Sequence, residues 1–392
     1  MTAREDRVAA VARRYVDERK FAGLEWHVEQ RGTVLARGRH GVADIGSGAP
    51  LAEKPLYRIY SMTKPIVSVL GLMLIEQGRL RLSDMLLQYD RRFAAMRVLH
   101  PEGRLVPADR PIHVEDLFTH RAGFTYEFIH GCHIAPYYRE LQISSNGTVS
   151  LDEMMGRLAS LPLAFQPGTR YRYGVNTDAL AHVIEKAADA PIDQLLKQHI
   201  LDPLGMSDTY YCVPASERGR IVGMHGVADI TAIPALDLRP HTLERVDVES
   251  MYPADDPGFR RGGHGLFSTM DDYAKFARML ITGKSADGQV LLSRPMLKMM
   301  RANRIPPEQL PLTIGLGPLP GYGWGLGVRV LLDPGKAMSL SNAGELGWAG
   351  AASTYFWVDP EEEMIGLAMT QYLGSALPLS DDLRSAAYQM LT

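Results

Sequence analysis

Strand-like segments at both ends of the chain constrain its fold more than any other sequence feature. Near the N-terminus, Glu25–Arg31 and Thr33–Arg37 are typical of two strands joined by the turn pair Arg31-Gly32. Three further segments rich in β-branched, aromatic and other apolar residues lie in the last third of the chain: Trp324–Leu331, Ser353–Val358 and Met364–Met369. We therefore predict one antiparallel sheet built from both ends of the chain.

The residues between these ends predict a second lobe that is mostly helical. The chain has 392 residues and 46% hydrophobic residues, enough for two lobes with large cores. The expected fold is α/β in the α+β sense, an antiparallel sheet flanked by helices with an interleaved helical lobe. We place the sheet domain at residues 1–75 and 260–392, the helical lobe at 76–259 and the active site between them. Helices are expected at Ser61–Gln77, Ser150–Leu161, Asp178–His199, Met270–Ile281 and Ser380–Met390.

Charge and composition favour a small-molecule partner. The 42 basic and 45 acidic residues are mixed along the sequence and leave a net charge of −3, so no single-sign field attracts nucleic acid or an anionic membrane. The longest apolar stretch, Pro65–Ile75, is shorter than the ~20 residues of a membrane span. The N-terminus predicts an amphipathic helix through Val8 and Tyr15 instead of an export signal, and with Cys132 and Cys212 as free thiols we expect a cytoplasmic protein.

A serine and a lysine three residues apart, Ser61 and Lys64, are the first candidates for chemistry. Side chains at i and i+3 share one helix face, and a helix N-terminus favours negative charge on a serine oxygen. A nearby amine could take the serine proton. Alone, the pair is also explained by Ser61 as an N-cap and Lys64 as a solvated residue of the first turn, because so short a motif arises by chance.

Five ordered segments together are much more specific than that pair. They are Ser61–Lys64, Leu117–Phe124, Gln166–Tyr173, Gly262–Thr269 and Trp348–Gly350. With these segments the chain resembles the serine β-lactamase and penicillin-binding-protein superfamily, particularly the family VIII carboxylesterases, which have a class C β-lactamase-like fold.

The resemblance implies a nucleophile at Ser61, a proton carrier at Lys64 and a phenol at Tyr173 between nucleophile and leaving group. Tyr171 is the alternative to Tyr173, but the Pro-Gly-Thr segment before it favours Tyr173. The resemblance also implies an oxyanion hole made by the backbone N–H groups of Ser61 and Ala351. Expected substrate contacts are Trp348, Gly350, Tyr126 and Tyr137, with pocket walls from the segments Tyr126–Tyr138 and Ile230–Pro257.

Two departures from the β-lactamase pattern favour ester substrates. Val175 stands where those enzymes have an asparagine, with Asn176 one position later, and Trp348 replaces the lysine of Lys-Thr-Gly. A tryptophan there favours apolar acyl or alcohol groups. His264 is an alternative general base, although a histidine in a glycine-rich loop is more often structural. The sequence contains neither HExxH nor a cysteine ligand pattern, so we expect no metal and no cofactor.

The sequence therefore predicts a serine carboxylesterase that hydrolyses short-chain or small-molecule esters through an acyl-enzyme on Ser61. An acyltransferase or a β-lactamase or peptidase could use the same site, and a catalytically silent acyl-binding protein could share the fold. The sequence does not identify the natural ester. It allows a homo-oligomer but does not establish the oligomeric state.

Overall fold

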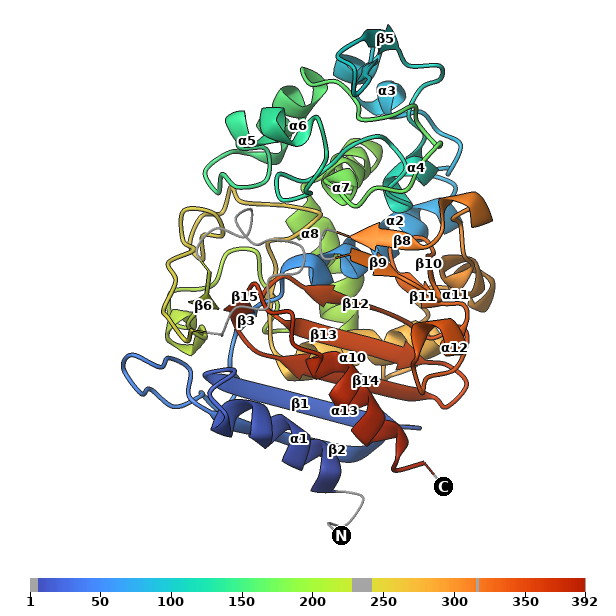
Figure 1. Ribbon diagram of the computed structural model, residues 1–392. Helices are drawn as coiled ribbons and strands as arrows, with labels where there is room; N and C mark the ends of the chain where they lie inside the picture. Colours follow the sequence, from blue (N-terminus) through green and yellow to red (C-terminus); the bar gives the residue numbers. More distant parts are fainter. Residues whose placement is uncertain (1–5, 228–241, 315–316, 392) are drawn as a thin grey trace.

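The computed structural model describes residues 6–227, 242–314 and 317–391, and a seven-stranded antiparallel sheet lies at its centre (Figure 1). The N-terminal hairpin and the C-terminal strands join in the order β10-β11-β12-β13-β14-β1-β2, which confirms the prediction of one sheet from both chain ends. The strands are β1 (Gly23–Gln30), β2 (Thr33–Gly41), β10 (Tyr322–Trp324), β11 (Arg329–Leu331), β12 (Leu346–Gly350), β13 (Thr354–Asp359) and β14 (Met364–Met369).

One expected strand was wrong in its extent, because Trp324–Leu331 contains the last residue of β10, a turn and β11. β10 and β11 pair with each other across the turn formed by residues 325–328. Gly327 has a φ of +88°, and a Cβ built there would lie 2.0 Å from Ser68 Oγ. A glycine is needed at this turn because the backbone is left-handed and lies against Ser68 on the helix α2 (Thr63–Glu76).

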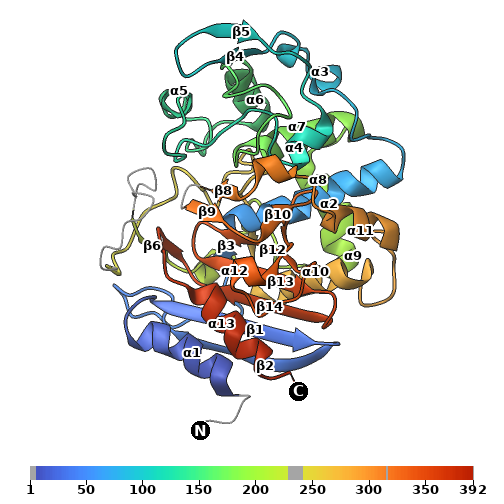
Figure 2. The same ribbon diagram turned by 45° about the vertical axis from the view of Figure 1, so that its right-hand side comes forward.

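Helices cover both faces of the sheet (Figures 1 and 2). α1 (Asp6–Asp17) and α13 (Leu379–Tyr388) pack together on one face, over Trp26 and Val28, which point to that side of β1. α10 (Met270–Thr282) packs on the opposite face, where its Arg278 pairs with Glu29. The alternation of side chains along a strand explains why residues two apart on β1 contact the same layer.

The middle of the chain is mostly helical, and its helices α3 (Leu86–Tyr89), α5 (Ala135–Glu140) and α6 (Leu151–Ala159) lie farthest from the two termini (Figure 1). The expected helix Asp178–His199 was wrong in extent: α7 (Asn176–Ala188) ends at Ala188, the next residue Asp189 has a φ of +53°, and a new helix begins after Pro191. The boundaries of the two lobes stay a prediction. The other helices of this region are α4 (Val114–Phe118), α8 (Ile192–Leu196), a π-helical turn at Lys197–Leu201 and α9 (Asp202–Leu204).

Short strand pairs and small helices complete the described part of the chain. The pairs are β3 (Tyr57–Arg58) with β7 (Phe267–Ser268), β4 (Arg97–Leu99) with β5 (Leu105–Pro107), β6 (His225–Gly226) with β15 (Tyr372–Leu373), and β8 (Leu312–Ile314) with β9 (Gly317–Leu319). The remaining α-helices are α11 (Arg294–Arg301) and α12 (Pro334–Ala337).

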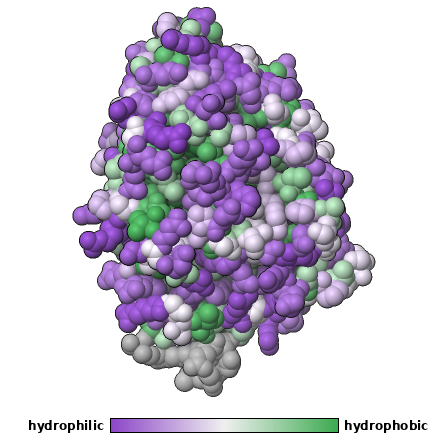
Figure 3. All heavy atoms as spheres, turned by 180° about the vertical axis from the view of Figure 1, so that it is seen from behind, coloured by the Kyte–Doolittle hydropathy of each residue, from purple (hydrophilic) through white to green (hydrophobic). Residues whose placement is uncertain are grey.

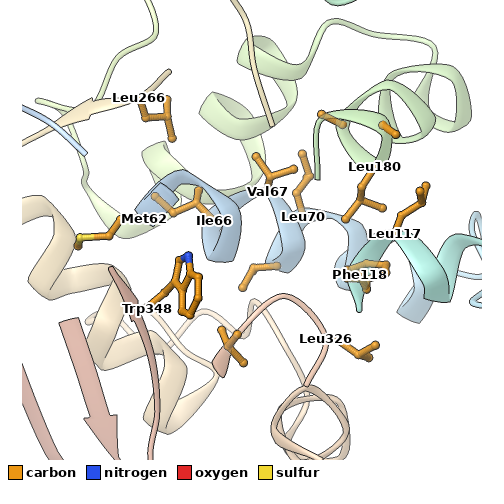
Figure 4. Packing of buried hydrophobic residues seen from close by; sticks show 14 of the residues in the cluster. Met62, Ile66, Val67, Leu70, Leu117, Phe118, Leu180, Leu266, Leu326 and Trp348 are labelled. Atoms are coloured by element: carbon orange, nitrogen blue, oxygen red, sulfur yellow. The ribbon is translucent and has the colours of Figure 1, made fainter. Parts of the chain in front are cut away.

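The helix α2 (Thr63–Glu76) lies between the sheet and the helices of the middle region and is buried along almost its whole length. Its sequence is apolar on every face, which is typical of a helix in the core. Figure 4 shows Trp348 and Leu326 on one side of α2, with Leu266 on the opposite side. The helix ends where Gly78 adopts a φ of +70°, the usual left-handed C-terminal residue. Because α2 is held from all sides, the residues at its start are held precisely.

The surface of the molecule seen in Figure 3 is mostly hydrophilic. On the face opposite to that of Figure 1, hydrophilic residues dominate and apolar residues form small separate patches (Figure 3). Within the described part of the chain, no helix combines the length and the hydrophobicity needed to cross a bilayer.

Candidate active site

Ser61 lies on a tight turn that leads into α2. Tyr60, Ser61 and Met62 form one turn of 3₁₀-helix, and Tyr60 has a φ of +44°. A non-glycine residue in this left-handed region stores strain of about 1–3 kcal/mol, which the surrounding packing must hold. The long helix expected from Ser61 therefore begins two residues later, and Lys64 falls in its first turn, on the same side as Ser61.

Ser61, Lys64 and Tyr173 meet at hydrogen-bond distance. Lys64 Nζ lies 3.0 Å from Ser61 Oγ, and the hydroxyl of Tyr173 donates to the same Oγ over 2.8 Å. Trp348 Nε1 donates to the Tyr173 oxygen over 3.1 Å. Three elements supply these groups: the start of α2, the loop before α7 and the strand β12. The explanation of Ser61 and Lys64 as a helix cap and a solvated residue does not fit, because Lys64 is fully buried.

Burial gives Lys64 the properties of a proton acceptor. Loss of solvation lowers the pKa of its amine to about 7, and the carboxylate of Asp178 opposes that change. The Lys64 ammonium donates to the Gly263 carbonyl (2.7 Å), while the Gly263 N–H donates to Asp178 (2.9 Å). The amine also lies 4.8 Å from the ring centroid of Tyr173 and 5.1 Å from that of Tyr126. Near neutral pH a substantial fraction of Lys64 is therefore uncharged and can take a proton.

Tyr173 is the tyrosine that contacts Ser61, the candidate nucleophile. Burial raises the pKa of its phenol well above the usual value, so the group rests protonated. His120 packs against its ring at 4.8 Å, and burial lowers the pKa of that imidazole, which keeps it neutral. The alternative, Tyr171, packs against Trp324, and its hydroxyl has no hydrogen-bond partner among the described residues.

Two pockets meet at Ser61. The narrow pocket encloses about 770 Å³, its opening included, and is lined by residues that include Tyr126, Glu127, Met251, Tyr252, Gly263 and His264. The wide pocket encloses about 1330 Å³ on the same measure and is lined by residues that include Tyr173, Ile314, Leu319, Arg329, Trp348, Gly350 and Tyr355. Ser61, Phe128 and Ala351 line both pockets. The site thus offers separate room for two halves of a substrate on either side of one serine.

The end of β12 packs directly against the turn that carries Ser61. A Cβ built at Gly350 would lie 2.5 Å from the Ile59 carbonyl oxygen, so only a glycine permits this approach. Gly350 also lines the wide pocket, and the exposed residue that follows it, Ala351, reaches both pockets. This brings Ala351 and Ser61, the two expected oxyanion donors, to the junction where a reacting carbonyl would lie.

The structure brings together most of the residues expected from the sequence, with Tyr137 as an exception. Tyr137 lies on α5 with 43% of its surface exposed and lines neither pocket, because its neighbour Tyr138 occupies the buried face of that short helix. Tyr126 lines the narrow pocket beside Lys64. Residues 230–241 of the second expected wall segment lie outside the described residues, whereas Met251 and Tyr252 line the narrow pocket.

His264 lines the narrow pocket as a neutral imidazole. Burial lowers its pKa, with the nearby charges of Arg261 and Lys64 acting in the same direction, and its ring packs against Tyr252 and Phe259. No sequence signal indicated two charged residues of the site: Asp178, whose charge acts on Lys64, and Arg329, which lines the wide pocket. Across residues 6–227, 242–314 and 317–391 there is no group of three or more His, Cys, Asp or Glu side chains that could hold a metal ion.

Comparisons with known proteins agree with this architecture. The chain is 32% identical over 371 residues to protein Rv1367c of Mycobacterium tuberculosis, covering 93% of this chain and 89% of the relative. It is 28% identical over 418 residues to esterase EstB of Burkholderia gladioli, covering 97% and 94%. The structure of EstCE1, described as a hydrolase with promiscuous acyltransferase activity, matches with a TM-score of 0.83 at 22% identity over 98% of each chain. The beta-lactamase family model matches residues 8–389, and the chain therefore belongs to the beta-lactamase family.

Proposed function

We propose that the protein is a serine carboxylesterase that hydrolyses small-molecule esters through an acyl-enzyme on Ser61. The observation that carries the proposal is the pair of short contacts to one oxygen: Ser61 Oγ lies 3.0 Å from the Lys64 amine and 2.8 Å from the Tyr173 hydroxyl. A nucleophile, a base and an acid within hydrogen-bond reach are what acyl transfer requires. The resemblance to EstB, a named esterase, supports the choice of an ester substrate.

The first step forms the acyl-enzyme. The neutral Lys64 amine takes the Ser61 proton as Oγ bonds to the ester carbonyl carbon, and the carbonyl electron pair moves onto oxygen. The backbone N–H groups of Ser61 and Ala351 stabilise that oxyanion, a contribution typically worth about 10²- to 10³-fold in rate for each donor. The bond to the alcohol oxygen then breaks, Tyr173 gives that oxygen a proton, and Lys64 returns the proton to Tyr173.

The second step releases the acid. A water molecule takes the place of the alcohol, loses a proton to the Tyr173 and Lys64 pair as it attacks the acyl carbon, and Ser61 leaves with a proton from that pair. The donor Trp348 Nε1, 3.1 Å from the Tyr173 oxygen, stabilises negative charge on the phenol during both transfers. If an alcohol replaces the water, the same residues make a new ester.

The proposal is tested by intact-mass spectrometry combined with chromophore release. Wild type and Ser61→Ala are mixed with p-nitrophenyl acetate and, separately, with a chromogenic cephalosporin. We expect rapid ester turnover with a Ser61-dependent acetyl adduct, and slow or absent lactam opening because Val175 and Trp348 replace the β-lactamase residues. Ester turnover that persists in Ser61→Ala would rule out the nucleophile, and rapid lactam opening would make the protein a β-lactamase.

An acyltransferase is the second candidate, and the two pockets that share Ser61 favour it. A second alcohol can occupy the wide pocket while the acyl group remains on Ser61. Product analysis with added alcohols of increasing size separates the two activities, because a transferase forms new ester in preference to free acid.

The cytoplasmic location and a homo-oligomeric state stay predictions from the sequence.

A further inference from the structure

The wide pocket has one permanently charged side chain among its described lining residues, the guanidinium of Arg329. The other members of that lining are apolar, aromatic, glycine, serine and histidine residues, and none is a carboxylate. The Arg329 side chain is 17% exposed, so it is largely buried but still reaches the pocket. A cation that is largely desolvated attracts an anion more strongly than a surface arginine does.

Neighbouring groups hold this guanidinium in place without using up its hydrogen-bond donors. Its carbon lies 4.2 Å from the ring centroid of Tyr322, a stacked arrangement. Its Nη2 donates to Glu345 over 3.0 Å. Among the described residues this is the only hydrogen bond that the Arg329 side chain donates, although a guanidinium has five N–H donors. Arg329 is therefore fixed in orientation and keeps donors for a ligand.

The carboxylate that holds Arg329 also holds a second arginine. Glu345 is completely buried and is shared by two guanidinium groups, because Arg384 Nε lies 3.1 Å from its second oxygen. The further partner of Arg384 is Asp381, 3.2 Å away and 71% exposed, where water screens its charge. Two guanidinium groups thus share the one carboxylate of Glu345, and of these two only Arg329 lines the wide pocket.

The position of Tyr173 decides which half of an ester reaches Arg329. Tyr173 lines the wide pocket and does not line the narrow pocket. In the proposed mechanism Tyr173 protonates the leaving alcohol, so the alcohol half lies in the wide pocket and the acyl half in the narrow one. We infer that the preferred substrates are esters whose alcohol half carries a carboxylate and that Arg329 binds this carboxylate. The inference rests on the proposed function for the direction of the ester.

The test compares 4-acetoxybenzoate with its uncharged analogue methyl 4-acetoxybenzoate, in wild type, Arg329→Met and Arg329→Lys. A charge-assisted contact predicts that Arg329→Met lowers kcat/KM for the carboxylate ester by roughly 10- to 100-fold, mainly through KM. Turnover of the methyl ester changes by no more than about twofold. Arg329→Lys keeps the charge and recovers part of the loss. The matched control is Arg31→Met, which removes an arginine that is 67% exposed at the turn between β1 and β2.

Each outcome bears on the inference. Equal losses for both esters would make Arg329 a structural cation for Glu345, and equal kcat/KM values for the two esters in wild type would remove the carboxylate preference; either result overturns the inference. Calorimetric binding of 4-hydroxybenzoate and of its methyl ester provides a readout that needs no turnover. If neither acetate ester is hydrolysed but wild type binds 4-hydroxybenzoate more tightly than its methyl ester and Arg329→Met abolishes that preference, the proposed function fails while the carboxylate site stands. If wild type shows no such binding preference, the inference fails as well.

Discussion

Replacing Asp178 by asparagine should move the pH dependence of ester hydrolysis towards acid. Lys64 must be neutral to accept the Ser61 proton, and its pKa is about 7. In wild type, kcat/KM therefore falls about tenfold for each pH unit below that value. The negative charge of Asp178 favours the ammonium form and raises the pKa of Lys64. The asparagine lacks this charge, so the neutral amine persists to lower pH.

The size of the effect follows from Gly263, which contacts both groups. Its N–H binds Asp178 at 2.9 Å and its carbonyl binds Lys64 at 2.7 Å, so the two charges lie about 5 to 8 Å apart. With an effective dielectric constant of about 20 this corresponds to roughly 2–3 kcal/mol. The acidic limb should then move down by about 1.5 to 2.5 pH units. The asparagine oxygen can still accept from Gly263, so the loop keeps its hydrogen bond.

The assay is kcat/KM for p-nitrophenyl acetate between pH 4.5 and 9, with buffers of constant ionic strength. Glu127→Gln is the matched control: Glu127 is also buried and lines the narrow pocket, but it is not among the charges that act on Lys64. A limb that stays within about 0.3 pH unit of wild type in Asp178→Asn would refute the electrostatic account of Lys64. An equal shift in Glu127→Gln would show that any buried carboxylate has the same effect.

Two further predictions test the support around the site. Trp348→Phe keeps an aromatic wall but removes the N–H that donates to the Tyr173 oxygen over 3.1 Å, so kcat for ester hydrolysis should fall by about 5- to 15-fold with little change in KM. The control is Trp26→Phe, which removes a buried indole N–H with no partner among the described residues and should leave kcat unchanged. Phe118→Ala empties a fully buried position beside α2 and should lower the free energy of unfolding, measured by urea titration, by about 3–5 kcal/mol. The control Val290→Ala, at a 60% exposed position, should change the free energy of unfolding by less than about 0.5 kcal/mol. A similarly small loss for Phe118→Ala would contradict tight packing at that position.

The sheet and the proximity of Ser61, Lys64 and Tyr173 could be predicted because their signals are local or motif-based. Residues of β1 alternate between two helix layers, and the apolar sequence of α2 requires burial on every face. The points where one helix or strand ends and the next begins were harder to predict from the sequence. The break before Pro191 and the turn after Trp324 depend on left-handed residues whose conformation is decided by packing, as at Gly327 against Ser68. Periodicity alone merges such neighbouring elements into one.

Substrate preference lies beyond local sequence signals for a different physical reason. Arg329 is one of many arginines, and nothing next to it in the sequence distinguishes it. It becomes a candidate substrate-binding residue only because antiparallel pairing places β11 between β10 and β12. Tyr322 on β10 and Glu345 before β12 then fix the guanidinium at the wall of a pocket that Tyr173 also lines. The same pairing separates two tasks. The proposed catalytic groups come from the buried helix α2, the turn before it and the loop before α7, whereas the charge proposed to select a substrate comes from a short strand near the sheet edge. Selectivity can therefore change through Arg329 while Ser61, Lys64 and Tyr173 keep their geometry.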